Sequence, residues 1–217
     1  AKHSFSFANW HNPERVHFGA LRVLNDDYIA PSMGFGTHPH DNMEIITIPL
    51  VGDLQHQDSM GHGAVICEGD IQVISAGTGI HHSERNPRDD KQVELLQLWI
   101  FPNQKDVTPR YDQISIRDLK KENEFYQILS PKEDDNGSWI YQNAWMHLGD
   151  FTQPTQTSYI LPAKGNGVYV FVIDGSVTIG EQKLSKRDAL GVWDTENIAF
   201  NIEKNSRVLL IDVPLQF

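Results

Sequence analysis

The sequence predicts an all-β protein. Its apolar residues recur mainly with a period of two, which is the period of a strand whose side chains alternate between two faces. Turn signals separate these runs at Val51–Asp53, Glu68–Asp70 and Asp174–Ser176. Only one stretch, Ile116–Glu124, has a helical pattern, and it is short. Together these three observations favour a β-sandwich or β-barrel architecture.

The predicted strands follow one another through both halves of the chain. In the first half, the strand pattern occupies Glu44–Leu50, Ile71–Ser75 and Val93–Phe101. The last of these is rich in apolar residues on both faces, as expected for a strand buried between two layers. In the second half the pattern returns in three shorter runs: Val168–Ile173, Val177–Ile179 and Val208–Val213.

A weak internal repeat relates the two halves. Ile48–Leu54 resembles Phe171–Val177, because each is an apolar strand followed by a glycine turn and a return strand. Glu68–Ile71 resembles Lys186–Ala189 in the same way. The repeat predicts two copies of one β-unit. Their boundary is expected between the helical pattern and the polar turn Asp134–Gly137.

Composition limits the classes of partner. The chain has 217 residues, enough for a sizeable core, and its net charge is −11, with 18 Lys and Arg against 29 Asp and Glu. No basic cluster is present, so binding to nucleic acid is not expected. Cys67 is the only cysteine, which excludes an intrachain disulfide and fits a reducing compartment. No apolar run approaches the ~20 residues of a membrane-spanning helix, and no charged-then-apolar leader opens the chain. We therefore expect a soluble, cytoplasmic protein without a membrane partner.

Two pairs of potential metal ligands are the most informative local feature. His38 and His40 form the first pair, and His82 and Glu84 form the second. In an extended strand, residues i and i+2 lie on the same side, so each pair can direct two ligand atoms at one point. Three imidazoles and one carboxylate are typical of an open catalytic metal site. Non-heme Fe(II) is favoured, with Mn, Ni, Cu, Co or Zn as alternatives.

The other histidines near these pairs have simpler interpretations. His81 has the opposite strand parity to His82 and is expected to point away from the site. His56 and His62 lie on the hairpin between the two pairs, and both are interpreted as exposed or pocket-rim polar residues.

The second copy of the repeat lacks equivalent ligands. Aligning the copies places Leu161 and Ala163 opposite the first pair, and Phe200 and Ile202 opposite the second. Beyond His82 the only remaining histidine is His147. We therefore expect one metal site in the first unit and a metal-free, apolar interior in the second.

The motifs resemble the signature motifs of the pirin family, whose members are bicupins. The resemblance is carried by Gly34–His40 with the following Met43-Glu44, and by Ser75–Ile80 leading into His82-Ser83-Glu84. Three flanking segments resemble the bacterial pirin-like branch, some of whose members cleave quercetin: Phe5–Asn9, Leu21–Asp27 and Thr108–Tyr111.

This resemblance implies a pair of cupin barrels, each a double-stranded β-helix or jelly roll. Residues 1–128 would form the metal-binding domain, and residues 129–217 would form a cupin domain without metal ligands. The resemblance also implies that iron or another divalent metal is held by His38, His40, His82 and Glu84.

A second carboxylate competes for the role of ligand. In the wider cupin pattern a glutamate follows the His-x-His motif after three residues, and Glu44 has that spacing, with strand parity placing it on the side of His40. The pirin pattern takes its carboxylate from the second motif instead, at Glu84. We therefore favour Glu84 as the ligand and expect Glu44 to lie outside the ligand set, as a supporting or substrate-side carboxylate.

The resemblance implies a dioxygenase that cleaves flavonols such as quercetin with O₂, for which Glu84 is the candidate catalytic base. The alternative is a non-enzymatic, metal- or redox-sensing protein that binds a protein partner, as described for eukaryotic pirins. The fold alone does not separate these functions. An apolar cavity reaching the metal from solvent would favour the enzyme.

Overall fold

The computed structural model describes residues 1–217 and contains twenty strands in four sheets, which confirms the all-β prediction. The chain divides into two compact units. The structure has no helix of the length and apolar character that crossing a membrane requires. Unit 1 comprises residues 1–17, 21–117 and 140–142, and unit 2 comprises residues 18–20, 118–139 and 143–217.

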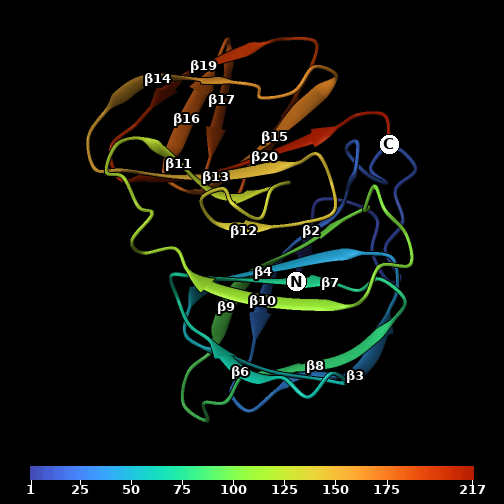
Figure 1. Ribbon diagram of the computed structural model, residues 1–217. Helices are drawn as coiled ribbons and strands as arrows, with labels where there is room; N and C mark the ends of the chain where they lie inside the picture. The colour runs from blue at the N-terminus through green and yellow to red at the C-terminus, as the bar shows by residue number, and fades with distance from the viewer. The chain divides into compact units, whose positions relative to one another are not determined.

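Unit 1 consists of two facing sheets (Figure 1). The six-stranded sheet has the order β1-β2-β9-β4-β7-β10, formed by β1 (Lys2–His3), β2 (Leu21–Ile29), β4 (Glu44–Val51), β7 (Asp70–Ser75), β9 (Val93–Ile100) and β10 (Arg110–Ser115). The four-stranded sheet has the order β3-β8-β5-β6, formed by β3 (Gly34–His40), β5 (Leu54–Asp58), β6 (Gly63–Ile66) and β8 (Ile80–Arg85).

The core of unit 1 lies between its two sheets. One cluster joins Ile45 of β4 to Ile80 of β8, and a second joins Leu54 of β5 to Leu95 of β9. Strand β9 is buried along nearly its whole length, as its two apolar faces predicted. Because burial of apolar area is the main favourable term in folding, these inward faces fix the register of the strands.

Unit 2 repeats this architecture. Its six-stranded sheet has the order β12-β11-β13-β20-β15-β18, formed by β11 (Phe125–Ser130), β12 (Ser138–Trp139), β13 (Trp145–Phe151), β15 (Asn166–Asp174), β18 (Ala189–Val192) and β20 (Ser206–Pro214). Its four-stranded sheet has the order β14-β19-β16-β17, formed by β14 (Thr155–Ile160), β16 (Ser176–Ile179), β17 (Gln182–Ser185) and β19 (Asn197–Ile202).

The strand orders confirm the internal repeat. The order β2-β9-β4-β7 in unit 1 matches β13-β20-β15-β18 in unit 2, and β3-β8-β5-β6 matches β14-β19-β16-β17. The aligned turn glycines also agree, since Gly52 has φ 78° and Gly175 has φ 81°. A Cβ on Gly175 would lie 2.2 Å from the Ser206 hydroxyl, so this turn requires glycine.

The helix expected at Ile116–Glu124 is absent, and that prediction is wrong. The segment is a series of turns in which the Ile116 amide donates to the Gly69 carbonyl. The Asn123 side chain accepts from the Thr152 amide. A helix this short does not repay the cost of its nucleus, so these contacts decide the conformation.

The predicted boundary between residues 128 and 129 falls within β11. As a statement about where the two domains separate, it stays a prediction.

Candidate metal centre and adjoining cavity

The two predicted ligand pairs lie on neighbouring strands of one sheet. Strands β3 and β8 are antiparallel, and His38 lies directly opposite His82. The register of β3 shifts between Phe35 and His38, which inserts one extra residue opposite β8. Such a bulge re-aims the side chains that follow it. The local fold therefore places His38 and His40 on the face that His82 also occupies.

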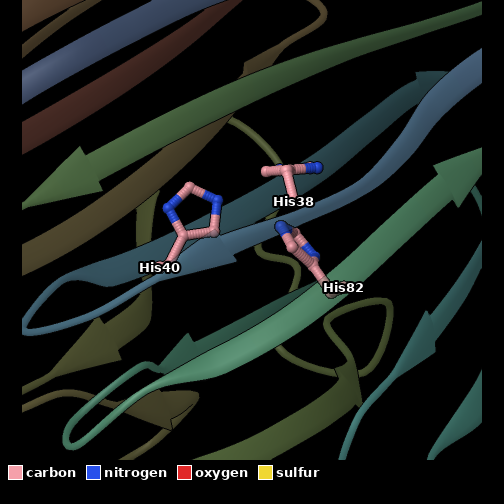
Figure 2. Close-up of side chains that lie close together, drawn as sticks. All are labelled: His38, His40 and His82. Atoms are coloured by element: carbon pink, nitrogen blue, oxygen red, sulfur yellow. The ribbon is translucent and has the colours of Figure 1, made fainter.

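The three imidazoles converge on one point, as Figure 2 shows. Ring centroids are 4.5 Å apart for His38 and His82, 4.9 Å for His38 and His40, and 5.0 Å for His40 and His82. One ligand nitrogen from each ring lies within 4.8 Å of the others. This geometry is suited to a single ion.

The surroundings of His40 and His82 favour the neutral form of both rings. Burial, followed by the neighbouring histidines, lowers the pKa of His82 to about 3. Burial and then His38 lower the pKa of His40 to about 4. Neutral imidazole is the form that coordinates metal, because a protonated ring has no free lone pair. The cluster is therefore ready to bind a cation at neutral pH.

The hydrogen bonds of the histidine rings are also consistent with metal binding. The Nδ1 of His38 lies 2.8 Å from the Gly36 carbonyl oxygen, which can only accept, so Nδ1 carries the proton and Nε2 is free. His82 is 1% exposed, and neither of its ring nitrogens has a hydrogen-bond partner. Buried polar atoms without partners are costly and uncommon. An ion at the cluster would satisfy one of them.

Glu84 lies beside this cluster rather than within it. Its side chain is 2% exposed, and its carboxylate is not among the atoms that converge with the three imidazoles. The Gln97 amide donates to both carboxylate oxygens at 3.3 and 3.2 Å, and the Thr47 hydroxyl lies 3.4 Å from one of them. The same hydroxyl lies 2.6 Å from the Gln97 carbonyl oxygen, which holds the amide in this orientation. Burial raises the pKa of Glu84 to about 7.

The expectation that Glu44 lies on the side of His40 is wrong. The turn between β3 and β4 includes Asn42 at φ 44°, which interrupts strand alternation. Thr47 faces Glu84, and Glu44, three residues earlier on the same strand, faces the other way. There its carboxylate accepts a 2.7 Å hydrogen bond from the Ser75 hydroxyl.

The predictions for the other histidines near the site are partly correct and partly wrong. His81 and His62 are exposed, as expected. His56 is completely buried, so its interpretation as an exposed or rim residue is wrong. Its ring stacks on Tyr111 at 5.0 Å, and its Nε2 lies 3.2 Å from an Asp58 carboxylate oxygen. The parity of Leu54 and His56 on β5 would have revealed this, since Leu54 faces the core.

A cavity of about 260 Å³ adjoins the cluster and contacts His38 and Glu84. Three aromatic side chains form its apolar wall: Phe7, Phe35 and Trp99. Trp99 packs edge-on against both His40, at 4.9 Å, and Phe7, at 5.3 Å. None of these wall residues was predicted from the sequence. Alternation along β9, which places Gln97 and Trp99 on one face, was the available signal.

The interior of unit 2 is mostly apolar, as predicted, but it also contains the buried carboxylate of Asp212. Phe200 and Ile202 are buried in its core, and Leu161 packs against that core. Ala163 lies beyond the end of β14. In place of the histidine cluster, the Tyr159 hydroxyl donates to Asp212 at 3.2 Å.

Comparison with known protein families covers both units. Residues 1–100 match the family model described as pirin, and residues 127–213 match the model described as the quercetinase C-terminal cupin domain. A curated relative from Escherichia coli strain K12, named quercetin 2,3-dioxygenase, is 40% identical over 98% of this chain and 90% of its own length. A pirin-like protein of Caulobacter vibrioides is 33% identical over 98% of this chain and 91% of its own length.

Solved structures agree with these matches. The crystal structure of the bacterial pirin YhhW from Escherichia coli in complex with nickel(II) superposes with a TM-score of 0.91 and 39% identity, covering 98% of this chain and 90% of that one. The two double-sheet units are accordingly cupin barrels, and the architecture is that of a bicupin. The chain belongs to the pirin family.

Proposed function

We propose that this protein is a metal-dependent dioxygenase of the pirin type that cleaves flavonols such as quercetin with O₂. The cavity beside the histidine cluster carries the proposal, because its aromatic wall leads to His38 and Glu84. A concave site with apolar walls and a few polar groups is the usual form of a small-molecule site. The relative named quercetin 2,3-dioxygenase supports the choice of substrate.

The proposed metal site uses His38, His40, His82 and Glu84. The nickel complex of the related pirin supports a divalent metal here. We favour Fe(II), because histidines combined with a carboxylate and open positions are typical of non-heme iron sites, and Mn, Ni, Cu, Co or Zn are the alternatives. When bound, the metal would supply Lewis acidity and, for a redox-active ion, a route for electrons to O₂.

Within this site, Glu84 is proposed as the general base that accepts the proton of the flavonol 3-hydroxyl. A pKa near 7 places its carboxylate close to the optimum for proton transfer at neutral pH. Gln97 and Thr47 hold that carboxylate, so its orientation is set before the ligand arrives. The aromatic wall would hold the planar rings and limit access of water.

The test combines metal analysis of the purified protein with oxygen consumption in the presence of quercetin. The expected result is one ion per chain and stoichiometric oxygen uptake as the flavonol absorption band disappears. Absence of flavonol turnover in fully metallated protein would contradict the proposal. That result would favour the alternative, a metal- or redox-sensing protein that binds a protein partner.

A further inference from the structure

Asp27 is a buried carboxylate that lines the cavity and accepts no hydrogen bond from a protein group. It lies on β2, its side chain is 5% exposed, and it lines the same cavity as Glu84. Glu84 accepts hydrogen bonds from Gln97, whereas no protein group donates a hydrogen bond to the Asp27 carboxylate. Asn25, two residues earlier, is already engaged with His3 at 2.8 Å.

Burial without a donor is unfavourable for a carboxylate. Desolvation by burial is the largest influence on the pKa of Asp27, and it raises that pKa. Buried polar groups are almost always hydrogen-bonded, and those that are not mark functional sites or the place of an absent partner. Because Asp27 lines the cavity, a molecule that fills the cavity lies within reach of this carboxylate.

We propose that Asp27 determines specificity, by accepting a hydrogen bond from a ligand hydroxyl other than the one presented to His38 and Glu84. The ligand class is therefore a planar aromatic with at least two separate hydroxyl groups. The aromatic wall formed by Phe7, Phe35 and Trp99 selects the rings, and the carboxylate selects the second hydroxyl. This inference rests on the proposed function, since it uses the same cavity.

The test measures binding without turnover. Quercetin and 3-hydroxyflavone share a ring system and the 3-hydroxyl, but 3-hydroxyflavone lacks every other hydroxyl. Each is titrated calorimetrically, under strictly anaerobic conditions, into wild type, Asp27→Ala, Asp27→Asn and Asp89→Ala. Asp89 is exposed, so its variant controls for the change in net charge.

Asp27→Ala should weaken quercetin binding about 10- to 100-fold, the range expected for a hydrogen bond to a charged group. Binding of 3-hydroxyflavone should be unchanged. Asp27→Asn should give an intermediate loss for quercetin, because its amide oxygen still accepts, and Asp89→Ala should match wild type. Thermal unfolding should show no destabilisation of Asp27→Ala, because the variant removes a buried carboxylate that lacks a donor.

Equal weakening of both ligands by Asp27→Ala, no weakening of either, or no binding of quercetin to wild type would overturn the inference. Two further outcomes distinguish failure of this inference from failure of the proposed function. Binding that depends on Asp27 without oxygen consumption leaves this inference intact and defeats the dioxygenase. Oxygen consumption together with quercetin binding that does not depend on Asp27 defeats this inference and leaves the dioxygenase proposal intact.

Discussion

The two barrels share a strand order but differ in what their interiors contain. In unit 1, β3 and β8 place three imidazoles together, and His82 has no hydrogen-bond partner. In unit 2, the corresponding strands β14 and β19 place Tyr159 opposite Ile198, and both belong to a continuous apolar core. One scaffold therefore supports a cluster of potential metal ligands in unit 1 and a mostly apolar core in unit 2.

This difference separates the part of the molecule that contributes mainly to stability from the part that contributes to function. The interior of unit 2 gains its free energy from apolar burial, which needs no ligand. The histidine cluster in unit 1 buries polar atoms that lack hydrogen-bond partners, so this region gains less free energy from burial. The sites placed on a fold, rather than the fold itself, determine function. Four predictions can break or sharpen this comparison.

The largest effect is expected for His82→Ala. It removes a central member of the cluster, so metal affinity and activity should fall by more than the roughly 10- to 100-fold caused by losing an outer partner of a ligand. Phe200→Ala in unit 2 is the matched control. It should lower the free energy of unfolding by about 3–5 kcal/mol and leave the metal content of folded protein unchanged. Metal analysis and urea unfolding of both variants measure the metal content and the free energy of unfolding. Full metal content in His82→Ala would show that His82 is not a metal ligand.

Glu84→Gln is expected to separate metal binding from turnover. An amide oxygen can still coordinate, so part of the metal should remain. Loss of a general base lowers the rate about 10²- to 10⁴-fold. The measurement is oxygen consumption with quercetin, normalised to bound metal. If the normalised rate equals that of wild type, Glu84 is not the base.

Asp212→Asn probes the buried polar pair of unit 2. Burial raises the pKa of Asp212 to about 6 from the ordinary 3.8, while Asn166 and Tyr159 donate to it and lower the pKa. Between pH 3.8 and 6 the folded state keeps a proton that the unfolded state releases, so stability falls as pH rises, and the penalty persists above pH 6. Its upper value is about 3 kcal/mol, from 1.36 kcal/mol per pKa unit.

The variant should therefore gain stability relative to wild type at pH 7 but not at pH 4, as measured by urea unfolding at both values. Taking this difference removes the contribution of nearby His147, whose pKa burial lowers to about 4. A variant that is less stable than wild type at pH 7 would mean that the charged carboxylate stabilises unit 2.

Glu44→Gln should have the smallest effect on catalysis. Its carboxylate bonds to Ser75 on the face opposite Thr47 and Glu84, so activity per bound metal should equal that of wild type. The assay used for Glu84→Gln measures it. A large loss of activity would show that Glu44 reaches the reaction, contrary to its orientation in the structure.

Strand parity predicted those features of the candidate site that depend on residues close together in the sequence. The two-residue spacing of His38 and His40, and the position of His82, follow from alternation within single strands, and the structure brings all three together. Each copy of the repeat of strand, glycine turn and strand could likewise be recognised within a short stretch of the sequence. Parity failed for Glu44 because the turn at Asn42 interrupts the alternation between two strands.

Other parts of the site depend on contacts between distant segments. Phe7, Asp27 and Trp99 meet at the cavity from three separate parts of the chain, and no local pattern relates them. Gln97 reaches Glu84 because β9 and β8 belong to the two facing sheets of unit 1, and only the packing of these sheets brings the two residues together. His56 was predictable by parity, but its polar character suggested exposure.

Trp99 gives the protein an internal optical reporter. Its indole contacts His40 on one side and lines the cavity on the other, and its N–H has no hydrogen-bond partner. An ion at the cluster or an aromatic ligand in the cavity would change the surroundings of this fluorophore directly. Its emission therefore distinguishes empty from filled sites without a label, and Trp99→Phe removes that signal while Trp139, Trp145 and Trp193 of unit 2 remain as an internal reference.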